Sequence, residues 1–330
     1  MKHCTFMFFF TFTIGFMSFA QEGVPVYFDY QSDNYFLLHP SMAGIGEGTK
    51  IRATVRQQWF NVNEAPNLQT LNAHSRLGKN TGFGVIVFND ANGYHSQTGL
   101  KLGYAHHLRF GSDFRVLHQL SFGIGVGGQQ SSLDESEFVS VEPDPTISGT
   151  KNSKSYFNTD IGISYNYLEL YAHATVLNVL GRGRDLYAAT ESNDLRRYVG
   201  SVGYVFGKSE WQIEPSILFQ LTEFNQEKTI DINTKIYKEM NFGTLWGGIS
   251  YRRSFEGTEI QTADTMGEQR LQLITPLIGA NYKKIMVSYN YSYQMGDMRI
   301  DDGGFHQLTL GYNFGQEKKR YDCNCPAVNY

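Results

Sequence analysis

The chain has 330 residues, of which 28 are basic and 32 acidic, giving a formal net charge of −4. It contains no long basic block that would recruit nucleic acid or anionic lipid, so a nucleic-acid-binding protein is disfavoured. Aromatic residues make up 15% of the chain and glycine contributes 34 residues, whereas the mean hydropathy is only −0.35. This mixture is typical of a β-barrel wall with one apolar and one wet face.

The first 20 residues have the features of an export signal. Lys2 precedes a mostly apolar stretch over residues 5–19, which is followed by the small residue Ala20. A positive start, a short apolar core and small residues before a cleavage site describe a secretory signal peptide. We therefore predict cleavage after Ala20. No later stretch reaches the roughly 18 apolar residues that a membrane helix requires.

The rest of the chain is predicted to form strands, because apolar and polar residues alternate as they do in a wall between lipid and water. Ile51 and Val55 share one face of the first such segment, and Arg52 and Arg56 share the other. Aromatic residues crowd the apolar face in later segments, whereas glycine and small polar residues crowd the opposite one. A soluble lipocalin-like barrel or sandwich would turn its apolar face inward, so we predict a transmembrane antiparallel barrel. About 14 strands are expected, at roughly 51–59, 67–77, 81–90, 100–110, 114–126, 157–165, 170–179, 196–206, 211–221, 229–237, 241–252, 271–281, 285–294 and 307–314.

Links of two lengths separate these segments. Short links are predicted to be periplasmic turns and longer ones external loops, as in known outer-membrane barrels. The turn at 111–113 is expected to lead straight into the next strand. Pro215 and Pro276 each remove a ladder hydrogen bond and are expected to mark bulges. The long external loops are expected at 129–154, 180–195 and 253–269.

The strands define four regions of the chain. Residues 49–314 are the predicted barrel, preceded by a signal peptide at 1–20 and a pre-barrel segment at 21–48. This aromatic segment either packs in the lumen or at the periplasmic rim as a functional element, or merely seals the bottom of the barrel. Residues 315–330 form a periplasmic tail, expected to be disordered, with a docking peptide as the alternative. A disulfide between Cys323 and Cys325 would be strained there, since residues two apart in an extended chain are poorly aimed for one.

Motifs of catalysis and metal binding give no positive indication. The glycines at 123–128 resemble a phosphate-binding loop, but no helix follows, so alternate glycines are better explained as space for a plug or a crowded interior. His106 and His107 point to opposite faces of one strand and cannot share a metal. No serine lies in a Gly-x-Ser-x-Gly elbow. We predict no catalytic residue, no cofactor and no metal, with calcium as the alternative to solvation for the loop acids Asp134, Glu135, Glu137, Glu142 and Asp144.

Local motifs in the first part of the mature chain resemble those of the PorP/SprF family. Residues 34–44 look like its N-P-A-x-A-G opening, with His39-Pro40 in place of Asn-Pro. Residues 56–74 are similar to its R-x-Q-W … A-P-x-T-Q-T … A-H block, and similar strings recur as far as 288–291. The resemblance therefore spans nearly the whole mature chain. The residues that carry it, and that could contact a partner, are Asn34, His39, Pro40, Ala43, Gly44, Arg56, Gln58, Trp59, Ala65, Pro66, Gln69, Thr70 and His74.

The resemblance implies an outer-membrane component of the type IX secretion and gliding apparatus of Bacteroidetes-type bacteria. Such a protein would act as a scaffold or anchor and would not be an enzyme. Its implied partners, besides outer-membrane lipids, are either periplasmic ring or lipoprotein subunits or one large secreted adhesin. A diffusion pore for small solutes is the alternative function, and an outer-membrane hydrolase, for which no nucleophile is evident, is a third. In either of the first two functions, a wet, positively lined wall is expected from Arg52, Arg56, Lys101 and Arg109.

Overall fold

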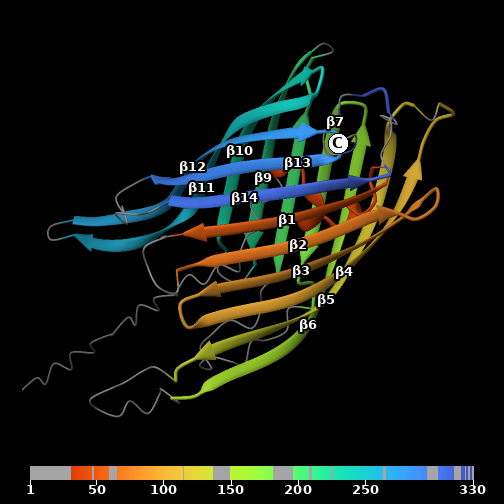
Figure 1. Ribbon diagram of the computed structural model, residues 1–330. Coiled ribbons are helices and arrows are strands. Elements are labelled where there is room, and N and C mark those ends of the chain that lie inside the picture. The colour runs from red at the N-terminus through yellow and green to blue at the C-terminus, as the bar shows by residue number, and fades with distance from the viewer. Residues whose placement is uncertain are drawn as a thin grey trace, which may run out of the picture.

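Fourteen antiparallel strands form one closed barrel (Figure 1). The computed structural model describes residues 31–46, 48–58, 65–113, 115–136, 149–180, 196–207, 210–223, 226–262, 265–295, 304–315, 321–323, 325 and 328, with side chains described outside 256–269. Each strand pairs with its neighbours in sequence, and β1 closes the ring on β14. The predicted fold class and strand number are thus confirmed. Within the described residues, no helix has the length and hydrophobicity needed to cross a bilayer.

Each strand overlaps one of the alternating segments of the sequence, and β4, β5, β6, β11 and β12 extend five or more residues beyond theirs. The strands are β1 (Thr49–Gln58), β2 (Asn67–Arg76), β3 (Thr81–Asn92), β4 (His95–Arg109), β5 (His118–Asp134), β6 (Lys151–Tyr167), β7 (Leu170–Leu177), β8 (Arg197–Tyr204), β9 (Trp211–Thr222), β10 (Lys228–Met240), β11 (Gly243–Thr262), β12 (Thr265–Tyr282), β13 (Ile285–Met295) and β14 (Gly304–Phe314).

Apolar side chains point out of the barrel and polar ones point in, because successive side chains of a strand alternate between its two faces. On β1, Val55 is 47% exposed, whereas Arg52 is 4% exposed and Thr54 is equally buried. On β5, Phe122 and Ile124 are exposed on the outer face. An apolar band around a polar interior is the arrangement that a bilayer requires of a barrel wall.

The two ends of the barrel differ in the length of their links. One end, called the turn end here, carries the links at 77–80, 110–117, 168–169, 205–210, 241–242 and 283–284, together with the start of β1 and the end of β14. The opposite end, the hairpin end, carries the longest links, at 135–150 and 178–196.

Strand takes up most of one expected long loop and the two ends of another. Most of 253–269 belongs to β11 and β12, and the ends of 129–154 belong to β5 and β6. Figure 1 shows β11 and β12 extending beyond their neighbours. A strand outside the bilayer is wet on both faces, so it need not alternate, and alternation therefore fails to report it. The expected loop at 180–195 lies almost wholly outside the described residues.

Three local predictions are also corrected. The register of β8 and β9 is unchanged across Pro215, since the pairs flanking it, Gly203 with Ser216 and Phe206 with Ile213, are three residues apart on both strands. The pairing of β12 with β13 is likewise in register across Pro276. Each proline leaves a gap in one ladder without a bulge, because it lacks only a donor. The turn at 111–113 does not lead directly into a strand, since β5 begins at His118.

Candidate functional site: a plug in the lumen

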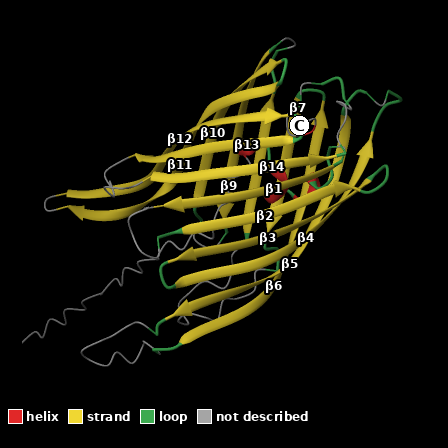
Figure 2. Cartoon of the chain, viewed as in Figure 1, coloured by secondary structure: helices red, strands yellow, loops and turns green. Residues whose placement is uncertain are grey.

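The described part of the pre-barrel segment, residues 31–46, lies inside the barrel and is called the plug here (Figure 2). It contains two 3-10 turns, η2 (Tyr35–Leu37) and η3 (Pro40–Met42). His39 is extended, as a residue before proline prefers, and Pro40 begins η3, where its missing N–H costs nothing. Tyr35, Phe36, Met42 and neighbouring plug residues form the main buried cluster of the described chain. The lumen is therefore occupied by the chain itself.

Lumen-facing glycines make room for the plug. A Cβ atom on Gly82 would lie 1.9 Å from the backbone oxygen of Ala43, and one on Gly84 would lie 2.3 Å from the Phe36 ring. Gly103 on β4 faces the same ring at 2.7 Å, and Gly162 on β6 meets Pro40 at 3.2 Å. Contacts below about 3.0 Å exclude any side chain unless the plug moves. The wall is thus shaped to this one segment.

Hydrogen bonds fix the middle of the plug to four different strands. The ring of His39 bonds Thr175 on β7 through Nδ1, at 2.8 Å, and Ser201 on β8 through Nε2, at 3.2 Å. The hydroxyls of Ser41 and Ser164 on β6 lie 2.6 Å apart. On β4, Nε2 of His107 donates to the carbonyl oxygen of Ala43 at 2.9 Å. Burial, and secondarily the nearby His173, lower the pKa of His39 well below its usual value, so this imidazole is neutral.

The plug leaves the lumen through a positive-φ turn that β2 holds in place. Gly44 has φ of +62°, a conformation that favours glycine, and its N–H donates to Nδ1 of His74 at 3.0 Å. The guanidinium of Arg76 donates to the carbonyl oxygens of Gly44 and Ile45, at 2.9 and 3.0 Å. The last residues of β2 therefore satisfy the backbone where the chain turns towards β1.

A buried charge cluster fixes the start of the plug. Lys235 on β10 pairs with Asp33 of the plug and lies 3.5 Å from Oε1 of Glu214 on β9. Glu214 also accepts hydrogen bonds from the hydroxyls of Tyr171, at 2.6 Å, and Tyr237, at 2.7 Å. Each charge in this cluster has an opposite charge or a donor beside it, which is what makes its burial tolerable.

Tyr35 extends this cluster into the plug. Its hydroxyl lies 2.8 Å from that of Tyr171. Burial raises the pKa of Tyr35 well above its usual value, so the phenol stays protonated and can donate. The plug is thus joined to the wall through a chain of hydroxyl and carboxylate groups that ends on Glu214.

The structure divides the sequence-predicted motif residues into two groups. Asn34, His39, Pro40, Ala43 and Gly44 belong to the plug, and His74 contacts it from β2. The others lie on β1, on β2 and in the link between these strands, towards the hairpin end. The N–H of Gln58 donates to the carbonyl of Pro66, which follows Ala65. Thr70 is buried in the lumen, whereas Gln69 is exposed and bonds Asn67. Trp59 lies outside the described residues. The motif is therefore not a single contact site.

The four predicted lumen-facing basic residues each have a partner in the barrel. Lys101 pairs with Asp160 at 2.8 Å, across Gly125 and Gly127 of β5. Arg52 donates to Asn313 at 2.8 Å. The guanidinium of Arg56 lies 4.0 Å from the ring centre of Phe305, and that of Arg109 lies 5.7 Å from the ring centre of Tyr321. These four residues therefore make contacts within the barrel and with the segments in its lumen, and they do not form an open, positively charged surface.

Sequence reasoning missed the charge cluster at Asp33, Glu214 and Lys235. The alternation of residues 211–221 indicates an inward-facing Glu214, but no spacing rule connects it to Asp33. No group of three or more His, Cys, Asp or Glu side chains that could hold a metal occurs among the described residues. Of the loop acids, Glu137, Glu142 and Asp144 lie outside them.

The C-terminal segment was predicted to be disordered, and this is wrong for the residues that the structure describes. Tyr321, Cys323, Cys325 and Val328 are buried in the same cluster as the plug. A disulfide joins Cys323 to Cys325, with Cα atoms 5.5 Å apart. In an extended chain, residues two apart would span up to about 7 Å, and a disulfide between them would be strained. The chain is more compact here, and the distance falls in the range that disulfides use.

Comparisons with solved structures gave distant likenesses only. No curated protein matches the chain. Among solved structures, the chain is similar to the CymD monoaromatic hydrocarbon channel, with a TM-score of 0.46 and 8% identity over 85% of this chain and 92% of that one. It is also similar to a TodX monoaromatic hydrocarbon channel mutant, with a TM-score of 0.49 and 9% identity over 85% and 94%. Omp33 of Acinetobacter baumannii gives a TM-score of 0.41 and 9% identity over 82% and 100%.

One family model covers most of the chain. It describes the type IX secretion system membrane protein PorP/SprF and matches residues 19–312, which include the plug and almost every residue of the barrel. This match agrees with the resemblance found in the motif residues. The chain is an outer-membrane β-barrel that belongs to the PorP/SprF family of type IX secretion system membrane proteins.

Proposed function

We propose that this barrel is a non-enzymatic scaffold or anchor of the type IX secretion system, and that it is closed to small solutes. The observation that carries the proposal is the plug, which lies in the lumen and is held by four strands and by a buried charge cluster. A diffusion pore needs a continuous water-filled path. A closed barrel instead offers its ends and its rim to other proteins.

The turn end is proposed to face the periplasm. Short links on one side and longer ones on the other are the usual asymmetry between the periplasmic and the outer face of such barrels. The plug joins β1, and the C-terminal segment returns, at this same end. Periplasmic subunits would therefore meet a surface that contains both ends of the strand series, whereas a secreted adhesin would meet the long hairpins.

Two kinds of partner fit the family: subunits of the periplasmic ring with their lipoproteins, and a single large adhesin that the barrel helps to export and retain. Affinity purification of the tagged barrel from its own cells, after mild crosslinking, separates them by mass and identity. Recovery of ring subunits supports the core-machinery role, and recovery of one giant repeat protein supports the dedicated-partner role. Recovery of neither would contradict the scaffold proposal.

Conductance in planar lipid bilayers tests the closed lumen. We expect the purified barrel to insert without a steady open current, because the plug blocks the described lumen. A steady current from correctly folded protein would support the alternative function, a diffusion pore for small solutes, and would remove the scaffold proposal's main support.

The plug itself is tested by replacing the residues that fix it while the barrel is kept. Replacing His39 and Ser41 together by alanine removes hydrogen bonds to β6, β7 and β8. Secretion is expected to fall although the barrel still assembles. Thr98→Ala is the matched control, because Thr98 is an exposed residue on the outer face of β4 and belongs neither to the motif nor to the plug contacts. Unaffected secretion in the plug variant would exclude a role for the plug.

A further inference from the structure

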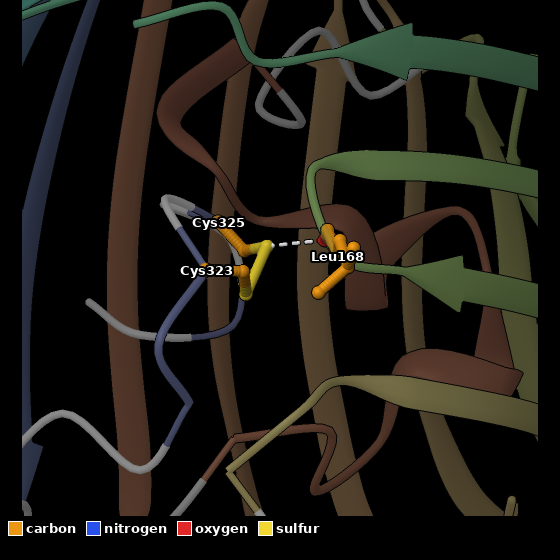
Figure 3. The surroundings of a disulfide bond; sticks show 3 residues. All are labelled: Leu168, Cys323 and Cys325. Atoms are coloured by element: carbon orange, nitrogen blue, oxygen red, sulfur yellow. Dashed lines mark hydrogen bonds between the residues drawn. A yellow bond between two sulfur atoms is a disulfide. The ribbon is translucent and has the colours of Figure 1, made fainter. Parts of the chain in front are cut away.

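The described C-terminal residues lie across the mouth of the barrel at the turn end. The chain leaves β14 beside β1, yet its contacts are with turns elsewhere on the ring. The N–H of Asp322 donates to the carbonyl of Arg115, in the β4–β5 link, at 3.0 Å. The Sγ atom of Cys325 lies 2.7 Å from the carbonyl oxygen of Leu168, in the β6–β7 link (Figure 3). The segment therefore joins the end of β14 to the β4–β5 and β6–β7 links, with which β14 has no strand pairing.

The same residues lie directly on the plug. A Cβ atom on Gly46 would be 2.5 Å from the carbonyl oxygen of Val328, so backbone touches backbone there. Tyr321, Cys323 and Val328 are each 2–3% exposed and share one apolar cluster with Met42 and Ile45 of the plug. Val328 and Cys325 also line, together with Met42, a small pocket beside Tyr171 and His173. The plug is thus covered on the side by which it would leave the lumen.

We propose that Tyr321, Asp322, Cys323, Cys325 and Val328 form a strap that locks the plug in the lumen, and that the Cys323–Cys325 disulfide keeps the strap in the shape that fits. The proposal concerns the barrel alone and does not depend on which protein it binds. It sets an order of events, since the strap has to lift before the plug can move towards the periplasm.

The disulfide favours docking of the strap by restricting the conformations of the strap when it is detached. A covalent link between residues two apart restricts the conformations of the free segment, so less conformational entropy is lost when it docks. Its burial beside Leu168 places this compact element in the mouth itself. A dithiol strap could extend, as the sequence alone suggested, and would then lose the match to the rim.

Hydrogen exchange with mass spectrometry on the purified, folded barrel tests the strap. Three variants are compared with the unchanged protein: a truncation after Gln316, the double substitution C323S/C325S, and Asp322→Ala. The last is the matched control, because its side chain is exposed and its backbone N–H is retained. Peptides covering 31–46 report the plug, and peptides from the strands report the barrel.

We expect plug amides to exchange about tenfold faster in the truncated barrel, somewhat less than that in C323S/C325S, and at the original rate in Asp322→Ala. Exchange in the strands is expected to be equal in all four proteins. Unchanged plug exchange after truncation would overturn the lock, as would equal acceleration in plug and strands, which indicates general loosening. Unchanged exchange in C323S/C325S alone would overturn the role of the disulfide. No partner is present, so these outcomes are separate from those that test secretion.

Discussion

Gly123 on β5 and Ser41 in the plug lie in backbone contact: a Cβ atom added to Gly123 would be 2.1 Å from the backbone nitrogen of Ser41. The glycine pattern of this strand is therefore explained by what the lumen contains. Gly123 makes room for the plug, whereas Gly125 and Gly127 make room for the pair of Asp160 and Lys101. A Cβ atom added to any of these three glycines would contact a specific neighbouring residue, so each position is glycine because a side chain would clash there.

Gly123→Ala is expected to displace the plug. Overpacking of this kind costs roughly 1–3 kcal/mol, and the plug gives way more easily than a paired strand does. Gly128→Ala is the matched control on the same strand, since the nearest atom to its Cβ is 3.8 Å away. Resistance of the plug to limited proteolysis measures the effect. Equal resistance of both variants would contradict the tight contact.

The barrel could be predicted from sequence because its signal is local. Alternation such as Gly123-Ile124-Gly125-Val126 reports two faces within a few residues, and a wall between lipid and water imposes it on each strand. The plug has no such period. Asp33 and Lys235 are 202 positions apart, and their contact follows from the closure of the ring, which no short spacing encodes. The strap was missed for the same reason, because its neighbours are turns distant in sequence.

The salt bridge of Asp33 with Lys235 is expected to contribute to plug docking. Both side chains are largely buried, at 10% and 3% exposed, so solvent screens their attraction little. A double-mutant cycle with Asp33→Asn and Lys235→Gln should show a coupling free energy of roughly 0.5–3 kcal/mol. Exchange rates of plug amides give the free energies. Glu214 remains beside Lys235 in the single Asp33 variant, which keeps that lysine paired and the barrel folded. Additive effects of the two substitutions would show that the pair is not coupled.

The plug is expected to loosen as pH falls. Burial holds the pKa of His39 well below its usual value while the plug is docked, whereas a detached plug would have an ordinary pKa of about 6.5. The detached form therefore binds a proton first as the pH drops through about 6.5. Docking loses up to about 1.4 kcal/mol per further pH unit, until the docked imidazole itself is protonated. Above about pH 7.5 both forms are neutral and no dependence is expected from this residue.

The predicted loosening at low pH is checked by measuring hydrogen exchange of the plug amides between pH 8 and pH 5, after correction for intrinsic exchange rates. His39 is faced by Thr175 and Ser201 and by the rings of His173 and Tyr35, and of these only His173 is a group that could gain a proton in this pH range. His39→Gln retains a polar side chain without a proton to gain, so it should flatten the curve without abolishing it. A curve as steep as that of the unchanged protein would assign the pH dependence to another group.

Ile124 lies on the outer face near the middle of β5 and is 49% exposed. If this face contacts acyl chains, Ile124→Lys costs about 2–4 kcal/mol at the bilayer midplane. Tyr167→Lys is the paired control, because Tyr167 ends β6 at the turn end, where a lysine reaches the interface and the cost falls to about 0–1 kcal/mol. Reversible urea unfolding in phospholipid vesicles compares the two. A soluble barrel exposed to water would tolerate both substitutions equally, so a cost at Ile124 alone ties the outward apolar face to the membrane.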